Sequence, residues 1–343
     1  MLECALIGPS MERSPDLADA VCAALWKLQH DEWPPPSLDT EKVEMCLEDC
    51  IRRGNAKAAL LLGRVLSGIE SSTIRASQLA TGHNMRRGAA LLLRAADSGI
   101  HEAWAHLYRI HADSRASVSN PQMARFFLEK AAAAGDACAQ RMLGALILRS
   151  ATRLHESEQG IHWLHQAAQR NDQHAAQLLS SLVLPVAGIE TQATSAIDAV
   201  CSVDPWLACR LRTARDFGLT KLEALNIDIV TGQRPWGLVV GHNPSIAQAK
   251  LAEPRAVPAL TPLVLENLRR TVAFFEQSRR DGGPTESDRR RRSRKLRYCL
   301  QHAGIEESLF FAEARSTVLC ALRQGPKWAF HARPLLQMAL SEI

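Results

Sequence analysis

Residues 123–144 read MARFFLEKAAAAGDACAQRMLG, and this stretch decides the fold because its pattern recurs elsewhere in the chain. Residues 86–107 (RRGAALLLRAADSGIHEAWAHL) and 160–179 (GIHWLHQAAQRNDQHAAQLL) repeat the same order of residue types. In each stretch two Ala precede a Gly or Asn, and an Ala and a Leu follow it. Self-similarity of this kind is typical of a chain built from repeated supersecondary units.

Four windows align on the Gly or Asn, which we take as position zero: Gly54, Gly99, Gly135 and Asn171. Three columns are identical in all four windows: Leu at −7 (Leu47, Leu92, Leu128, Leu164), Ala at +4 (Ala58, Ala103, Ala139, Ala175) and Leu at +8 (Leu62, Leu107, Leu143, Leu179). Two further columns are apolar throughout: −3 (Ile51, Ala96, Ala132, Ala168) and +11 (Val65, Ile110, Leu146, Leu182). Chance does not align five columns in this way.

The columns predict a helical hairpin repeated four times. A first helix ends at the Gly or Asn, the residues that adopt a left-handed backbone conformation most readily. A second helix follows, whose small Ala at +4 lets the two backbones approach, while the Leu columns fill the space between them. One hairpin cannot bury its apolar face alone, so neighbours must stack into an α/α solenoid. An aromatic content of only 5% agrees with an all-α core of Ala and Leu.

These windows resemble Sel-like repeats, which are relatives of the tetratricopeptide repeat, over about residues 38–184. The family pattern of an aromatic residue, Leu, Ala-Ala, Gly, Ala and Leu-Gly is met fully in one window (Phe127, Leu128, Ala131, Ala132, Gly135, Ala139, Leu143, Gly144) and in part in the next (Trp163, Leu164, Ala167, Ala168). Tyr108 and Ser180 depart from it where the family has Gly. The resemblance implies a right-handed superhelix that serves as a platform for protein partners.

The sequence predicts that the whole chain consists of three regions. Residues 1–37 form a capping helix, which begins at Ser14-Pro15-Asp16, and a Pro-rich linker. Residues 38–194 form the solenoid, with Asp204 as a degenerate fifth position zero beyond it. Residues 195–343 form a mostly helical region, in which 228–241 is a hairpin or ordered loop and the segment with Pro244, Pro254, Pro258 and Pro262 is an irregular connector. Helices are expected at 262–280, 287–302, 305–324 and 334–341.

The net charge of +5 is concentrated in one segment. Residues 264–297 hold 11 basic and 5 acidic side chains, whereas the rest of the chain holds 30 and 31. The cations at its centre are Arg289, Arg290, Arg291, Arg292, Arg294, Lys295 and Arg297. Because they repel one another, an anionic partner such as nucleic acid or an acidic surface would stabilise them. The alternative is a solvated helix face whose inner side is Leu296, Cys299 and Leu300.

No catalytic or cofactor motif stands out. Glu158, His162 and His165 lie on one helical face at metal-ligand spacing, but they flank a repeat core and fit an exposed helix face equally well. The pairs Cys46/Cys50 and Cys299/His302 lack the second half of a metal motif. The chain has no GxGxxG, GxxxxGK[ST], GxSxG or HExxH motif. We therefore predict a non-enzymatic protein without a cofactor or metal.

The sequence thus predicts a protein-interaction scaffold or adaptor. The second helices would line a concave groove, in which Trp104, Tyr108 and Gln140 contact a partner. The alternative hypothesis is a nucleic-acid or anionic-surface binding protein that acts through residues 289–297. Nine Cys in an odd, scattered arrangement, no apolar run long enough for a membrane span and no export signal predict a cytoplasmic protein with reduced thiols.

Overall fold

The computed structural model describes residues 15–28, 39–69, 80, 82–241, 254–280 and 289–341. The chain divides into two compact units, residues 1–139 and 140–342, and the boundary lies within a helix, α8 (Ala137–Ser150). The predicted domain boundaries after residues 37 and 194 remain predictions. The expected N-cap at Ser14 and the Pro-rich linker lie outside the described residues.

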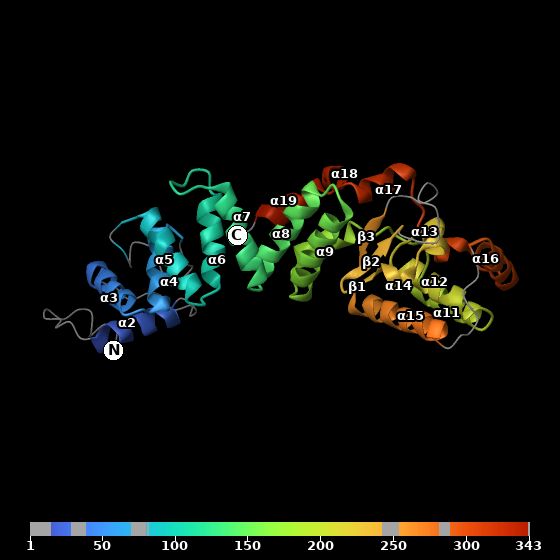
Figure 1. Cartoon of the computed structure of the whole chain (residues 1–343), viewed down its shortest axis with the longest axis horizontal. Helices are drawn as coiled ribbons and strands as arrows, with labels where there is room; N and C mark the ends of the chain where they lie inside the picture. The colour runs from blue at the N-terminus through green and yellow to red at the C-terminus, as the bar shows by residue number, and fades with distance from the viewer. Residues whose placement is uncertain are drawn as a thin grey trace. The chain divides into compact units, whose positions relative to one another are not determined.

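Unit 1 is helical (Figure 1). Its helices are α2 (Pro15–Leu28), α3 (Thr40–Arg52), α4 (Ala56–Leu66), α5 (Met85–Asp97), α6 (Glu102–Ala112) and α7 (Pro121–Ala133). The hairpins α3–α4 and α5–α6 form as the repeat pattern predicts, and one hydrophobic core runs through them. Val21 and Leu25 of α2 join this core, and the capping role of this helix remains a prediction.

Position zero of each window has the backbone conformation that the sequence predicted. The φ angles of Gly54, Gly99 and Gly135 are 92°, 92° and 96°, and Asn171, at 65°, is the only residue other than Gly with a positive φ in the described part of the chain. All twelve residues of the −7, +4 and +8 columns are buried. The predicted helical hairpins and their Ala–Leu core are therefore confirmed.

Asp204 does not occupy position zero. Its φ is −146°, and its carboxylate caps α12 (Pro205–Asp216) by accepting a hydrogen bond from the Leu207 amide at 3.1 Å. It therefore corresponds to Asp172, the residue after position zero, which caps α10 (Gln173–Ser180) through the Ala175 amide at 2.8 Å. Shifted by one residue, the fifth window places Leu211 at +8, where it is buried. A fifth helical hairpin, α11 (Glu190–Cys201) with α12, is present, and its two helices pack on each other.

The rest of unit 2 surrounds a small antiparallel sheet. After α8 come α9 (Leu154–Gln169), α10, α11 and α12; then α13 (Lys221–Asn226), α14 (Ile229–Gly232), β1 (Gln233–Arg234), β2 (Gly237–Val240), β3 (Arg255–Pro258), α15 (Pro262–Arg280), α16 (Arg289–Ala303), η3 (Glu307–Leu309), α17 (Ser316–Arg323), α18 (Gly325–His331) and α19 (Arg333–Ser341). No helix in the described ranges has the length and apolar composition needed to cross a membrane.

The sheet confirms one sequence expectation and corrects another. β1 and β2 form the predicted hairpin, but residues 255–258 of the predicted irregular connector are a strand, paired with β2 from Gly237↔Pro258 to Val240↔Arg255. Pro258 stands at the last position of β3, where a residue without an amide hydrogen is tolerated. The side chains alternate: Val239 contributes to the core shared with α9, whereas Val240 contributes to the core shared with α15.

The expected helix over 305–324 is interrupted. Only Ser316–Arg323 is an α-helix, because Phe310, Phe311 and Ala312 run as non-helical chain into the core, and the Ala312 amide donates to the Leu219 carbonyl at 2.9 Å. The expected helices at 262–280, 287–302 and 334–341 are present as α15, α16 and α19 within a residue or two. The C-terminal region is therefore mostly helical, as expected.

Candidate partner-binding surfaces

Trp104 and Tyr108 lie one turn apart on α6 and are half-buried. Neighbouring positions of the same helix, Ala103 and Leu107, fill the hairpin core, which leaves the aromatic side chains beside that core. The Trp104 ring stacks on Phe127 of α7, with ring centroids 6.0 Å apart and an interplanar angle of 26°. Burial, and then the nearby Cys138 thiol, raises the pKa of Tyr108. The two rings are therefore anchored at their inner edges.

Gln140 does not belong to the same accessible surface. Only 2% of the residue is exposed, because its carboxamide accepts a hydrogen bond from Arg170 Nη1 at 2.5 Å and donates one to Gln166 Oε1 at 3.1 Å. This side chain links α8 to α9 inside unit 2. The prediction of Gln140 as a partner contact is therefore corrected: a polar residue in a variable repeat column is used here for packing between helices.

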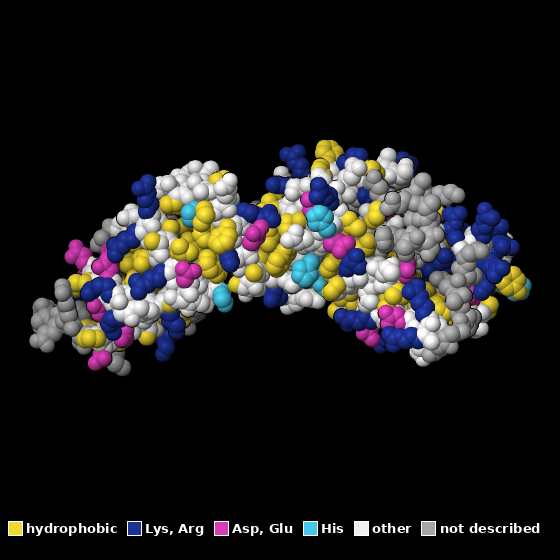
Figure 2. Space-filling view, viewed as in Figure 1, with side chains coloured by type: hydrophobic (Ala, Val, Ile, Leu, Met, Phe, Trp, Pro, Cys, Tyr) yellow, Lys and Arg dark blue, Asp and Glu magenta, His cyan; other side chains and the backbone are white. Residues whose placement is uncertain are grey.

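An exposed apolar surface on α7 was missed by sequence reasoning. Met123 and Phe126 expose 38% and 45% of their surfaces, although the repeat pattern assigned no role to either residue. Phe126 contacts Phe127 edge to face at 5.5 Å, and the Lys130 ammonium lies 5.3 Å from its ring centroid. Hydrophobic side chains are visible over α6 and α7 in Figure 2. Sequence reasoning missed these residues because neither Met123 nor Phe126 belongs to a column of the repeat pattern.

The Arg-rich segment forms α16, as predicted. Leu296, Cys299 and Leu300 are buried in the core of unit 2, so the helix has the inner side expected from the sequence. The cationic side chains on its surface are Arg289, Arg290, Arg291, Arg294, Lys295 and Arg297, whereas Arg292 is half-buried. Lys295 forms an ion pair with Asp204 at 2.7 Å. Figure 2 shows the basic side chains gathered over this helix.

A shallow groove of about 600 Å³ lies between α13 and the first turns of α16. Its lining residues are Lys221, Leu222, Leu225, Arg289, Arg290, Ser293 and Arg294. The groove combines a basic wall with two Leu side chains, a combination that the sequence did not reveal because α13 and α16 are about seventy residues apart.

The proposed His–carboxylate cluster on α9 is used in other contacts. The Glu158 carboxylate accepts a hydrogen bond from Arg234 Nε at 2.9 Å, and His162 Nε2 lies 3.0 Å from Gln166 Nε2. Burial, and then the nearby His162, lowers the pKa of His165. In the part of the chain that the structure describes, no three potential metal-binding side chains come together.

The candidate cysteine pairs are packed thiols. Burial, and then the negative charges of neighbouring groups, raises the pKa of Cys50 to about 12, and burial raises that of Cys46. Cys299 lies in the core of unit 2, and its neighbour His302 stacks on Tyr298 with ring centroids 4.7 Å apart. The high pKa values keep these thiols protonated and weakly nucleophilic at neutral pH.

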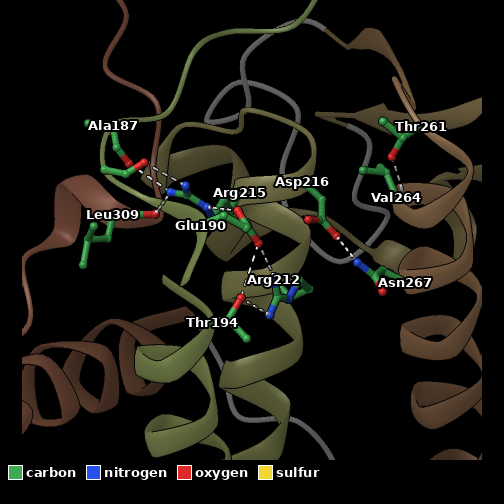
Figure 3. A network of polar contacts seen from close by, with 11 residues as sticks. Ala187, Glu190, Thr194, Arg212, Arg215, Asp216, Thr261, Val264, Asn267 and Leu309 are labelled. Atoms are coloured by element: carbon green, nitrogen blue, oxygen red, sulfur yellow. Dashed lines mark hydrogen bonds and ion pairs between the residues drawn. The ribbon is translucent and has the colours of Figure 1, made fainter. Parts of the chain in front are cut away.

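A polar network links α11, α12 and η3 (Figure 3). Arg215 donates hydrogen bonds to Glu190 Oε2 at 2.7 Å and to the carbonyl oxygens of Ala187, Gly188 and Leu309 at 2.9, 3.0 and 2.6 Å. One guanidinium therefore fixes the loop before α11 and the end of η3. This network is structural, since all four of its acceptors come from the chain itself.

Asp216 lies at the edge of this network and points toward α15 (Figure 3). It accepts a hydrogen bond from Asn267 Nδ2 at 3.0 Å. Burial raises the pKa of Asp216 to about 6, against the hydrogen bond from Asn267 and the positive charge of Arg212. The ionised Asp216 carboxylate therefore lowers the stability of the folded state at neutral pH.

The raised pKa of Asp216 predicts a pH-dependent effect of Asp216→Asn. Because folding raises this pKa above its ordinary value of 3.8, wild-type stability should fall as the pH rises from about 4 to about 6. We expect the variant to be more stable than wild type at neutral pH by on the order of 2 kcal/mol, and to match it below about pH 4. Urea unfolding at both pH values measures this. Asp198→Asn, at an exposed site on α11, controls for the lost charge, and an equal difference at the two pH values would contradict the assignment.

Comparison with known proteins gives similarities of fold only. A protective antigen of uropathogenic Escherichia coli that displays an SLR fold is 20% identical, with a TM-score of 0.35 over 49% of this chain and 32% of that one. A Sel1 repeat protein from Oxalobacter formigenes is 25% identical, with a TM-score of 0.32 over 39% of this chain and 93% of that one. An immunity protein from Pseudomonas aeruginosa is 15% identical, with a TM-score of 0.30 over 78% and 83%.

This chain spans about a third of the first of these structures. No family model matches the chain, and no curated protein matches it. The class that the structure defines is an all-α protein of repeated helical hairpins. Its repeat pattern is Sel-like, and proteins with Sel1 repeats or an SLR fold are among the structures to which it is similar. TM-scores below 0.5 do not bear on function, so the functional proposal depends on the residues of this chain.

Proposed function

We propose that this protein is a non-enzymatic interaction scaffold that binds a protein partner through Trp104 and Tyr108 on α6. The observation that supports the proposal is the half-buried state of these two aromatic side chains, one turn apart on a helix whose inner positions are already filled. Aromatic side chains that are anchored on one edge and accessible on the other provide much of the binding energy in protein interfaces.

The surrounding hairpins favour this use of α6. Its Ala and Leu columns are buried, and the left-handed Gly99 lies in the turn that precedes it. Phe127 supports the Trp104 ring from the neighbouring helix α7. A partner segment would therefore meet rings that are already ordered, so that little side-chain entropy is lost on binding. The exposed Met123 and Phe126 of α7 offer further apolar area within unit 1.

The test compares the double variant Trp104→Ala/Tyr108→Ala with wild type in capture of partners from an extract of the source cells. We expect the variant to lose about tenfold or more in affinity for the captured partner, because two anchor rings are removed. Arg109→Ala is the matched control, since this exposed residue follows Tyr108 on the same helix but is turned about 100° away from it. Circular dichroism must show retained helicity in both variants. Equal capture by a folded double variant would contradict the proposal.

A second candidate function is binding of an anionic partner by α16. A specific observation favours it: Arg289, Arg290 and Arg294 are exposed and form no hydrogen bond or ion pair with any described residue. These three cations lie within six residues of one another on the same helix, so their like charges repel. An anion bound there would reduce this mutual repulsion.

A further inference from the structure

The groove between α13 and α16 has two chemically different walls. On one side stand the guanidinium groups of Arg289, Arg290 and Arg294. On the other, Leu222 exposes 52% of its surface, and Leu225, which also lines the groove, is buried. A basic helix that is only solvated needs no apolar wall. Exposure of Leu222 to water is unfavourable, and burial of this side chain against a bound apolar group would be favourable.

The position of Leu222 is fixed by the start of α13. Thr220 and Glu223 form a capping box, in which the Thr220 hydroxyl and the Glu223 carboxylate satisfy each other's backbone amides. Lys221 Nζ is held by the Glu307 carboxylate at 2.5 and 2.8 Å, so its charge is already compensated. The cations left for a ligand are therefore the three Arg side chains of α16, and Leu222 is presented to them by a rigid turn.

We propose that this groove binds an acidic segment of a partner protein, with an apolar side chain of that segment packed on Leu222 and its carboxylates paired with Arg289, Arg290 and Arg294. The inference deepens the second proposed function by naming the anionic partner of α16 as a polypeptide. Arg guanidinium groups bind carboxylates through paired, charge-assisted hydrogen bonds. A segment that carries both Glu or Asp and an apolar residue matches both walls.

The lining disfavours the other anionic partners. Among the described residues that line the groove, none is aromatic, whereas single-stranded nucleic acid is held by stacking of its bases on aromatic side chains. Tyr298 of α16 is exposed, but it stacks on His302 and is not part of the groove. An anionic membrane needs several inserted apolar side chains for stable binding, and Leu222 is a single one.

The experiment uses the full chain and four labelled probes at low ionic strength. The probes are a short peptide of Glu residues with one Leu, the same peptide with Ser in place of Leu, single-stranded poly(U) RNA, and vesicles containing phosphatidylserine. The variants are Arg289→Gln/Arg290→Gln/Arg294→Gln, Leu222→Ser, and Arg297→Gln as the matched control, because Arg297 is an exposed cation of the same helix outside the groove.

We expect the Glu–Leu peptide to bind, and the triple variant to weaken its binding by about tenfold or more. Leu222→Ser should weaken binding of the Leu peptide several-fold and leave the Ser peptide unchanged, while Arg297→Gln should change neither by more than about twofold. The chain could instead bind RNA or vesicles, with Arg297→Gln weakening that binding as much as the triple Arg variant does and Leu222→Ser leaving it unchanged. This result would overturn the inference but support the second proposed function. Failure of all four probes to bind would overturn both.

Discussion

Glu223→Gln is expected to lower the free energy of unfolding of unit 2 by about 3 to 5 kcal/mol, the usual cost of removing one partner of a buried ion pair. Arg255, with 1% of its surface exposed, donates hydrogen bonds to Glu223 from Nε to Oε1 at 2.8 Å and from Nη2 to Oε2 at 3.2 Å. Burial opposes ionisation of Glu223, but the hydrogen bond and charge of Arg255 hold the pKa of this carboxyl below its ordinary value. The variant would leave a buried guanidinium without its counter-charge.

Urea unfolding followed by circular dichroism measures this loss. The matched control is Glu307→Gln, which removes an ion pair with Lys221 in the same unit. Because both of those side chains are more than two-fifths exposed, the control should cost less than about 1 kcal/mol. A Glu223→Gln variant that unfolds within about 1 kcal/mol of wild type would show that Arg255 is stabilised by its bonds to the Leu182 and Gly218 carbonyls alone.

The repeats could be predicted from the sequence because each identical column meets a local structural requirement, such as a left-handed turn or a close contact between two helices. Asn171 could be aligned with three Gly residues because only a few residue types tolerate a left-handed backbone, and its φ of 65° confirms the alignment. The misplaced Asp204 shows the limit of the same reasoning. An Asp is a good N-cap but a poor substitute at position zero, and comparison with Asp172 identifies Asp204 as the N-cap of α12.

Long-range pairing could not be predicted in the same way. The Glu223–Arg255 pair joins a capping box to a strand that was expected to be an irregular connector, so neither residue carried a sequence signal of burial. Among the candidate site residues, Trp104 and Tyr108 are half-buried on one helix face. Gln140, by contrast, forms hydrogen bonds with Arg170 and Gln166. Spacing alone does not reveal which variable positions face another helix. The groove beside α16 was missed for the same reason, because Leu222 comes from a distant helix.

A second large effect is expected at the crossing of α8 and α9, where two Gly residues allow the helices to touch. A Cβ at Gly144 would lie 2.8 Å from the Gly160 carbonyl oxygen and 2.8 Å from Leu164 Cγ. A Cβ at Gly160 would lie 2.6 Å from Leu148 Cγ. The same close approach occurs in unit 1, where a Cβ at Gly88 would lie 2.9 Å from the Gly63 carbonyl oxygen. The Gly that follows the +8 Leu is therefore a packing requirement of these two crossings.

Gly144→Val should lower the free energy of unfolding by about 3 kcal/mol, because the backbone neighbour at Gly160 cannot move without separating the helices. Gly144→Ala should cost roughly 2 kcal/mol, even though Ala favours a helix over Gly by about 1 kcal/mol. Gly54→Ala is the informative control: φ is +92° there and no atom lies within 4 Å of the added Cβ, so only backbone strain of about 1 to 2 kcal/mol is expected. If Gly144→Ala is neutral while Gly54→Ala destabilises, the close approach of α8 and α9 is not required for the fold. The reverse order would show that helix contact, rather than the left-handed turn, is the more demanding feature of the repeat.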